Sequence, residues 1–341
     1  MTTSIVGWDI GGVNTKVARV VGSDVVATGV RPFAIERDRA ALAPLLRDLA
    51  RAAEAQAADV HAVTMTAELS QVFRTKREGV VFVLDAVVAA FPDAGIRVYT
   101  VDGRFVSSDV ARREPLAVAA ANWAATARLV AGTHPDCVLV DIGSTTTDVI
   151  PIVGGAVVAR GRTDLERLRE GELIYTGALR TPVEAITSVV ELEGRPTGVS
   201  AEGFAIAADV HLWLGAIAAE DYTCPTPDGR PATRAYAAER LARVVCADRE
   251  MLDDAAINAI AARVADRQAE RVAAALDAVR RRHPALRLAV VTGLGEFIAV
   301  RAARRAGLGV ASLSGLLGRA ARHAPAAAVA LLCAAAELSP V

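Results

Sequence analysis

The sequence is poor in cysteine and in aromatic residues, and neither sign of charge is in excess. Four cysteines are scattered along 341 residues without a Cys-x-x-Cys pair, which argues against a disulfide framework or a zinc knuckle and fits a reducing compartment. The 38 Lys and Arg residues are balanced by 39 Asp and Glu residues, so the chain has no basic field to hold nucleic acid. Hydrophobic residues make up 53% of the chain, which indicates an ordered globular protein.

Long apolar runs are also missing. The stretch at residues 324–336 has 13 residues, is rich in alanine and is interrupted by Pro325, so it is too short for a membrane span. No basic segment precedes the first strand-like run, and we therefore expect no signal peptide. These absences predict a cytoplasmic protein of about two domains that has neither nucleic acid nor a membrane as a partner.

The most informative feature that is present is an internal repeat. The motif DIGGVNTKV at residues 9–17 is echoed by DIGSTTTDV at residues 141–149. Each copy follows an apolar run and precedes β-type residues, and each is followed by a second Gly-containing turn, which predicts a three-stranded meander. Two meanders about 130 residues apart indicate two related domains, because this period is too long for a solenoid.

Helical periodicity and flanking Gly and Pro residues place the other elements. Strands are expected over residues 60–65, 96–101 and 286–291. Helices are expected over residues 39–58, 79–91, 115–131, 253–283 and 324–338. The repeat then divides the chain into an N-terminal lobe at 1–125 and a C-terminal lobe at 126–341, with a proline-rich insertion at about 195–250.

The first motif has the residues of a phosphate-binding turn. Gly11 and Gly12 would allow positive φ and let backbone N–H groups converge on an anion. Asp9 would end a buried strand, where its charge is costly unless it holds a cation, and Mg²⁺ is the usual ion beside phosphates. An ordinary glycine-rich hairpin is the alternative. The candidate phosphate ligands are Gly11, Gly12, Asn14, Thr15 and Lys16.

The second motif lines its turn with hydroxyl groups between two carboxylates, Asp141 and Asp148, which suits a phosphate with Mg²⁺. We therefore take Asp9 and Asp141 as candidate metal ligands. A polar surface turn with an Asp cap is the alternative. The candidate phosphate ligands here are Gly143, Ser144, Thr145, Thr146 and Thr147.

A third turn follows the strand predicted at residues 286–291. Gly293, Gly295 and Glu296 would let a flat ring, such as that of a nucleotide, lie close to the backbone. A Gly-x-Gly sequence is weak evidence by itself, and a plain strand-to-helix turn is an equal alternative.

In this order and spacing, the three turns resemble those of the actin-like ATPase superfamily. More closely, the chain resembles the hydantoinase/oxoprolinase-related group, and within it the proteins of the tetrahydromethanopterin-linked one-carbon transfer pathway, over nearly its whole length. The matching segments are residues 7–16, 64–69, 141–151, 160–177, 208–215 and 228–231. The resemblance implies an α/β, ribonuclease H-like fold with two related lobes around a central cleft.

The resemblance also implies a reaction, since archaeal members of the group are synthases of the methanofuran core. Such a transferase joins an aminomethyl-furan methyl diphosphate to the phenol oxygen of a glutamyl-tyramine, or of a tyrosine-type acceptor in methylofuran synthesis, and releases diphosphate. Mg²⁺ and Lys16 would neutralise the leaving group. The phenol needs a base, for which Glu68 is the first candidate and Asp148 the second. A capping role is the alternative for Glu68.

Two other classes of function stay open. An ATP-dependent small-molecule kinase or a hydantoinase/oxoprolinase-like enzyme would place adenine at the third turn, whereas the transferase allows ATP but does not require it. A nucleotide-dependent scaffold is the non-enzymatic alternative. Under the leading hypothesis the partners are two small-molecule substrates, a diphosphate donor and a phenol acceptor, and a homo-oligomer is allowed.

Overall fold

The computed structural model describes residues 4–338, which fold into two compact units. Unit 1 contains the described residues of Met1–Cys137, Ile150–Glu170 and Ser312–Val341. Unit 2 contains Val138–Val149 and Gly171–Ala311. This division differs from the expected boundary near residue 125, because the chain returns to unit 1 twice after the second motif.

Unit 1 is built on a six-stranded sheet with the order β3-β2-β1-β4-β5-β6. The first three strands form the expected antiparallel meander, and β1 pairs in parallel with β4. The strands are β1 (Ser4–Ile10), β2 (Asn14–Val21), β3 (Asp24–Pro32), β4 (Val60–Met65), β5 (Ile96–Tyr99) and β6 (Phe105–Val106). The helices are α1 (Leu42–Ala52), α2 (Lys76–Ala90), α3 (Ser108–Arg113), α4 (Pro115–Val118), α5 (Asn122–Ala131), α6 (Asp164–Glu170), α12 (Ser314–Leu317) and α13 (Ala324–Leu338), with short 3₁₀ turns η1 (Arg39–Ala41), η2 (Ala67–Leu69) and η4 (Gly318–His323).

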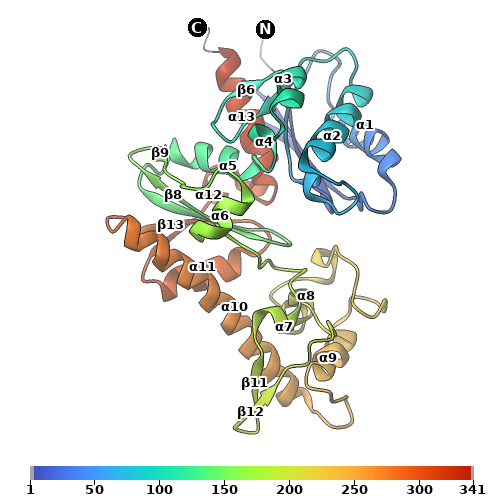
Figure 1. Ribbon diagram of the computed structural model, residues 1–341, viewed down its shortest axis with the longest axis vertical. Helices are drawn as coiled ribbons and strands as arrows, with labels where there is room; N and C mark the ends of the chain where they lie inside the picture. The colour runs from blue at the N-terminus through green and yellow to red at the C-terminus, as the bar shows by residue number, and fades with distance from the viewer. Residues whose placement is uncertain (1–3, 339–341) are drawn as a thin grey trace. The chain divides into compact units, whose positions relative to one another are not determined.

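Helices cover both faces of this sheet (Figure 1), with α1 and α2 on one face and α13 on the other. The alanine-rich α13 lies so close to β1 that a Cβ atom at Gly7 would be 2.1 Å from the carbonyl oxygen of Ala326. Small side chains on both partners permit this approach. The close packing explains why the C-terminal helix belongs to unit 1 and not to the unit that contains the second motif.

The second sheet has the order β10-β8-β7-β13-β14, and β9 pairs with β8. In unit 2 the long helix α10 and the shorter α11 bury their apolar faces with the core residues of β7 and β13. The strands are β7 (Cys137–Ile142), β8 (Thr147–Val153), β9 (Ala156–Val157), β10 (Leu173–Ile174), β13 (Leu288–Thr292) and β14 (Gly309–Ser312). The helices are α10 (Asp254–Arg282) and α11 (Glu296–Arg305).

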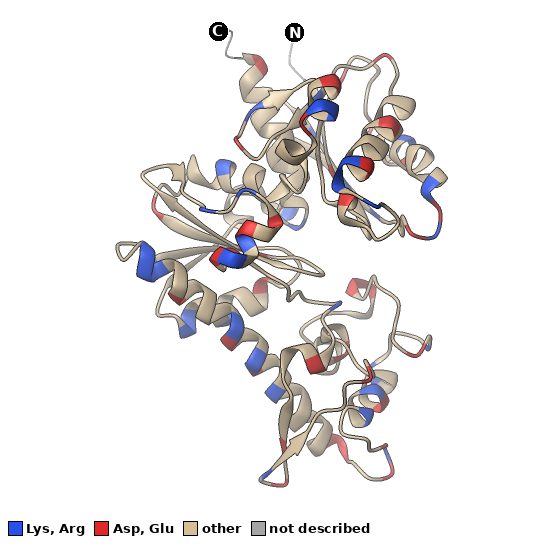
Figure 2. Cartoon of the chain, in the orientation of Figure 1, with Lys and Arg blue, Asp and Glu red and all other residues tan. Residues whose placement is uncertain are grey.

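The weakly patterned part of unit 2 has a core of its own. Residues from both sides of the expected insertion, including Val183 and Ile257, pack with it in one apolar cluster. Its elements are α7 (Val183–Ile186), the hairpin β11 (Val189–Leu192) and β12 (Arg195–Gly198), α8 (Ala207–Trp213), η3 (Ala219–Asp221) and α9 (Arg234–Arg243). Figure 2 shows charges of both signs dispersed over the helices and loops. Within residues 4–338 none of the helices has the length and apolar character that a membrane span needs.

Two predicted helices are shorter than expected. The helix predicted at 39–58 ends at Ala52, because Glu54 adopts φ 57° and the N–H of Ala55 bonds to the carbonyl of Ala50 at 2.9 Å, which is a left-handed helix end. The helix predicted at 115–131 is two helices, α4 and α5, and Ala120 between them has φ 50°. A left-handed alanine is uncommon and stores strain, and such residues cluster at functional sites.

Candidate functional site

The first motif forms a tight turn between β1 and β2 in unit 1. The N–H of Gly11 donates to the carbonyl of Asn14 at 3.1 Å, and strand register sets Asp9 opposite Lys16, with 3.5 Å between Oδ2 and Nζ. Neither Gly11 nor Gly12 has positive φ, so that part of the prediction is wrong. Gly11 is needed because the backbone of the turn approaches it closely: a Cβ there would lie 2.6 Å from the carbonyl oxygen of Asn14.

Strand alternation separates the predicted ligands of this turn into two groups. Asp9 and Lys16 share one face of the sheet, and Thr64 of β4 is in register with Asp9. Thr15 precedes Lys16 in the strand, is fully buried and faces the other side. The structure therefore brings together Asp9, Asn14 and Lys16 but not Thr15.

The segment that carries Glu68 packs against this turn. The N–H of Thr66 donates to the carbonyl of Ile10 at 2.9 Å, and a Cβ at Gly12 would be 3.9 Å from the Cα of Ala67. Both contacts lie within unit 1. The predicted base and the first phosphate turn are thus neighbours at one edge of the sheet.

The carboxyl group of Glu68 is buried, with 1% of the residue exposed. Among residues 4–338 its oxygens have no hydrogen bond of good geometry, although the backbone N–H groups of Glu68 and Ala120 lie close enough to lower its pKa. Burial raises its pKa to about 8, and the nearby cation of Lys76 limits the rise. A carboxyl group of this kind exchanges its proton near neutral pH, which suits a general base. The fold makes room for it at Gly79, where a Cβ would be 2.5 Å from the Cα of Glu68.

A polar cluster that we did not anticipate surrounds this acid. Lys76 forms an ion pair with Asp164 at 2.6 Å, and Asp164 is 3.9 Å from a guanidinium nitrogen of Arg167. That guanidinium lies over the ring of Trp123, 4.3 Å from its centroid. The Lys76–Asp164 pair joins segments 88 residues apart, and no sequence pattern linked them.

The second motif forms an equivalent turn between β7 and β8 in unit 2. The N–H of Gly143 donates to the carbonyl of Thr146 at 3.0 Å, as Gly11 does to Asn14 in unit 1, so the repeat seen in the sequence extends to backbone geometry. Ser144 and Thr145 are half-buried, with 3.4 Å between their hydroxyl oxygens. Thr147 is fully buried and its hydroxyl donates to the carbonyl of Thr176 at 2.6 Å. We therefore assign Thr147 a structural role.

The third turn packs on the second motif. Gly293 has φ 94°, and a Cβ there would lie 2.5 Å from Oδ1 of Asp141. The N–H of Gly295 donates to the carbonyl of Ile142 at 2.9 Å, and Glu296 begins α11. The structure thus brings this turn to Asp141. The second candidate base, Asp148, is buried in β8 opposite Leu173 of β10.

The donors around the first turn fit Mg²⁺. Asn14 and Thr64 each hold a buried side-chain oxygen without a hydrogen-bond partner in the described chain, on the strand edge that carries Asp9. Hard oxygen donors are what Mg²⁺ prefers. No group of three or more His, Cys, Asp or Glu forms a metal site among residues 4–338. The donors therefore fit an ion that takes some of its ligands from the protein and the others from a phosphate, as Mg²⁺ commonly does.

Comparisons with known proteins agree with these features. The family model described as hydantoinase/oxoprolinase matches residues 59–336. The chain belongs to this family. A curated relative from Methanocaldococcus jannaschii, (4-{4-[2-(gamma-L-glutamylamino)ethyl]phenoxymethyl}furan-2-yl)methanamine synthase, is 40% identical over 87% of this chain and 88% of its own. The synthase of the same name from Methanococcus vannielii is 46% identical over 36% of this chain and 55% of its own.

Solved structures confirm the fold that the resemblance implied for this family member. The nucleotide-free structure of acetone carboxylase aligns with 98% of this chain and 70% of its own chain, with a TM-score of 0.58 at 12% identity. The chain has the α/β fold of the actin-like ATPases. That the two turns grip one ligand in a shared cleft stays a prediction.

Proposed function

We propose that this family member is a transferase of furan-cofactor biosynthesis, which alkylates a phenol oxygen with a furan methyl diphosphate. The relative's name describes such an ether, a phenoxymethyl group on a furan that bears a methanamine. The observation that carries the proposal is the position of Glu68, a buried acid with a pKa raised to about 8, beside the turn that presents Lys16.

The proposed step balances without ATP. The phenol proton passes to the carboxylate of Glu68, the phenol oxygen bonds to the furan methylene carbon, and the bond from that carbon to diphosphate breaks. Lys16 and the backbone N–H groups of the turns stabilise the charge that develops on the leaving group. Bound Mg²⁺, for which Asp9 of the first turn and Asp141 of the second are the candidate ligands, would add positive charge to the phosphates. The acceptor is a glutamyl-tyramine or a tyrosine-type phenol.

The test is a two-substrate assay with purified protein, Mg²⁺ and no ATP. We expect equal amounts of ether product, detected by mass spectrometry, and released diphosphate. Absence of the ether with both substrates present would overturn the proposal.

An ATP-dependent kinase or hydrolase is the alternative, and the third turn favours it. Gly293 and Gly295 let this turn pack directly against Asp141 and Ile142, and the resemblance to ATP-using relatives would place adenine at this turn. ATP turnover stimulated by a small substrate would support this alternative, and calorimetry that shows no nucleotide binding would remove it.

Lys16→Ala should lower kcat/KM for the diphosphate donor by about 10²–10³-fold, the usual cost of losing one group that stabilises transition-state charge. Steady-state kinetics with each substrate varied in turn measures this effect. Arg19→Ala is the matched control, since it removes another cation of β2, paired with Asp59 at 3.2 Å, away from the turn. Equal kinetics in both variants would contradict the role of Lys16.

A further inference from the structure

A single buried amide in unit 2 connects three segments of the chain. Gln268 of α10 is 1% exposed, and its Nε2 donates to Oγ1 of Thr176 at 2.9 Å and to the carbonyl of Gly177 at 2.8 Å. Its Oε1 is 2.8 Å from Nε2 of His211 in α8. Each polar atom of this amide is therefore engaged, deep in the unit and away from solvent.

The partners fix which way the amide faces. Both N–H groups of Gln268 are used as donors, so its oxygen must accept, and Nε2 of His211 must carry the proton. Burial lowers the pKa of His211 to about 4, which keeps the imidazole neutral. The ring is held further by the edge of Phe297, with 4.8 Å between centroids. His211 thus holds the Gln268 amide in the orientation in which its nitrogen donates to Thr176 and Gly177.

The segment that Gln268 holds supports the second motif. The N–H of Ala178 donates to the carbonyl of Gly143 at 2.9 Å, and the N–H of Arg180 donates to that of Ser144 at 2.9 Å. Gly177 lies so near the turn that a Cβ would be 2.5 Å from the backbone nitrogen of Thr145. Two carbonyls of the turn are therefore committed to the protein, whereas within residues 4–338 the hydroxyls of Ser144 and Thr145 contact only each other, at 3.4 Å, and would be the groups that meet a ligand.

We infer that Gln268 is a positioning residue for diphosphate binding, which holds residues 176–180 against the second turn, while His211 holds the amide of Gln268. The inference rests on the proposed function, since it assumes that this turn binds the donor's diphosphate. A turn whose support shifts by a fraction of an ångström presents its hydroxyls poorly, and binding weakens without loss of any ligand group.

The test measures binding of inorganic diphosphate with Mg²⁺ by calorimetry. Gln268→Glu has nearly the same shape but replaces both donors with a carboxylate that repels the carbonyl of Gly177. We expect about 10–100-fold weaker binding, which corresponds to the loss of buried hydrogen bonds. The KM for the furan diphosphate should rise in parallel, and the KM for the phenol acceptor should not change.

Tyr222→Phe is the matched control. It removes another buried hydrogen bond of α8, from the Tyr222 hydroxyl to Asp209 at 3.0 Å, which does not lead to the turn. This variant should lower the melting temperature and leave diphosphate binding unchanged. A purely structural role for Gln268 would make the two variants alike in binding.

His211→Phe is a second test that keeps Gln268 and does not bury a new charge. It releases the amide to rotate, and we expect roughly 3–10-fold weaker diphosphate binding from a partial loss of its hydrogen bonds. If Gln268→Glu does not fold, this variant decides alone. If the folded variants among Gln268→Glu and His211→Phe bind diphosphate as tightly as the wild type, the inference is overturned but the proposed function is not. Wild-type protein that neither binds diphosphate nor forms the ether overturns the proposed function.

Discussion

Glu68→Gln is expected to lower the turnover of the proposed transferase by about 10²–10⁴-fold, the usual contribution of a general base. The amide fills the same buried space but cannot accept the phenol proton. Steady-state assays of ether formation at pH 8 measure the effect. The protein should remain folded, because the amide is uncharged, has the same shape and keeps an oxygen toward the backbone N–H groups of Glu68 and Ala120.

The pH profile separates a base from a structural acid. The pKa of Glu68 is raised to about 8 and the carboxylate is the active form, so kcat/KM should rise with pH and level off above about 8. Lys76→Met removes the cation that lowers this pKa and should move the inflection to higher pH. A wild-type profile without an inflection in this range would contradict the assignment.

The pH dependence of the free energy of unfolding tests the pKa of Glu68 independently of catalysis. Because the native pKa of Glu68 lies above its ordinary value, the native state binds the proton more tightly than the unfolded state does. The contribution of Glu68 to stability should therefore fall as pH rises from the ordinary carboxyl range through about 8. Glu68→Gln lacks this term, so its stability relative to the wild type should increase over that range in urea unfolding.

Glu78→Gln is the matched control for both experiments. Glu78 lies in the first turn of α2, and its carboxylate accepts from the N–H of Arg74 at 2.9 Å on the surface. Its loss should leave the pH profile unchanged. Near-normal turnover in Glu68→Gln, with the wild-type pH profile of kcat/KM, would contradict the assignment of Glu68 as the base. The two-substrate assay would then still test the reaction class.

The sequence predicted best what depends on neighbours along the chain. Both meanders and both tight turns are confirmed, since alternating β-type residues around Gly-rich turns are a local signal. Glu68 follows the strand predicted at residues 60–65, and the structure buries it next to the first turn, while its role as the base stays a prediction. The motif at residues 141–149 likewise predicted the turn around Ser144 and Thr145.

Features that depend on distant packing could not be predicted in this way. Nothing near Lys76 or Gln268 in the chain indicates that each meets residues about 90 positions away. The break at Ala120 was missed because alanine favours helix, and tertiary context overrides that preference. The sequence gives no sign that the C-terminal helix packs on β1, because its close fit to Gly7 exists only in space.

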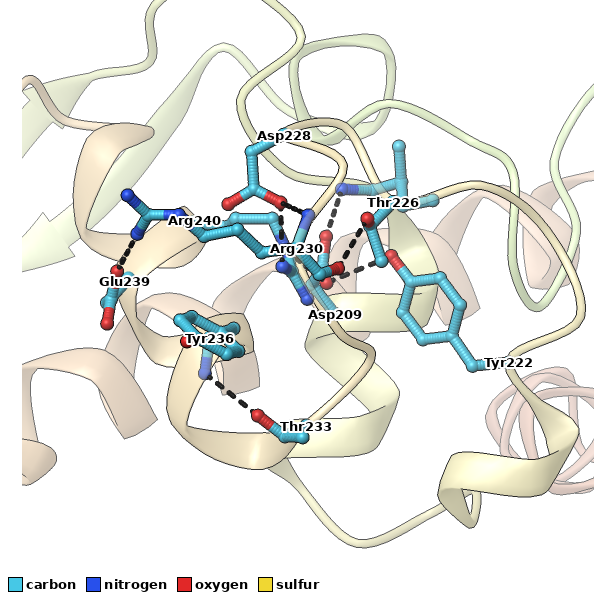
Figure 3. A network of polar contacts seen from close by, with 10 residues as sticks. Asp209, Tyr222, Thr226, Asp228, Arg230, Thr233, Tyr236, Glu239 and Arg240 are labelled. Atoms are coloured by element: carbon cyan, nitrogen blue, oxygen red, sulfur yellow. Dashed lines mark hydrogen bonds and ion pairs between the residues drawn. The ribbon is translucent and has the colours of Figure 1, made fainter.

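Arg240→Met is expected to destabilise the protein by about 3–5 kcal/mol, the typical cost of leaving one member of a buried ion pair unpaired. Arg240 and Asp209 are both fully buried in unit 2, with 2.7 Å between Nε and Oδ1 (Figure 3). Burial raises the pKa of Asp209, and the guanidinium counteracts it. The free energy of unfolding, from urea denaturation, measures the loss.

Arg230→Met is the matched control in the same network. Arg230 pairs with Glu239 at 2.7 Å on the surface, where half of its side chain is exposed, so its loss should cost at most about 1 kcal/mol. Equal destabilisation by the two variants would show that the burial of Arg240 is not what matters.

The double variant Asp209→Asn/Arg240→Met tests the cause of the large effect. If the cost of Arg240→Met comes from the stranded carboxylate, then neutralising Asp209 should recover part of the lost stability, although each single variant is destabilising. The amide oxygen can still accept from the N–H of Ile206, and the amide nitrogen can donate to the hydroxyl of Tyr222, since these two partners lie 3.0 Å from the two carboxylate oxygens. Strictly additive losses would mean that Arg240 does not act through the charge of Asp209, and would leave its packing and its second ion pair, with Asp228 at 3.0 Å, as the source of the loss.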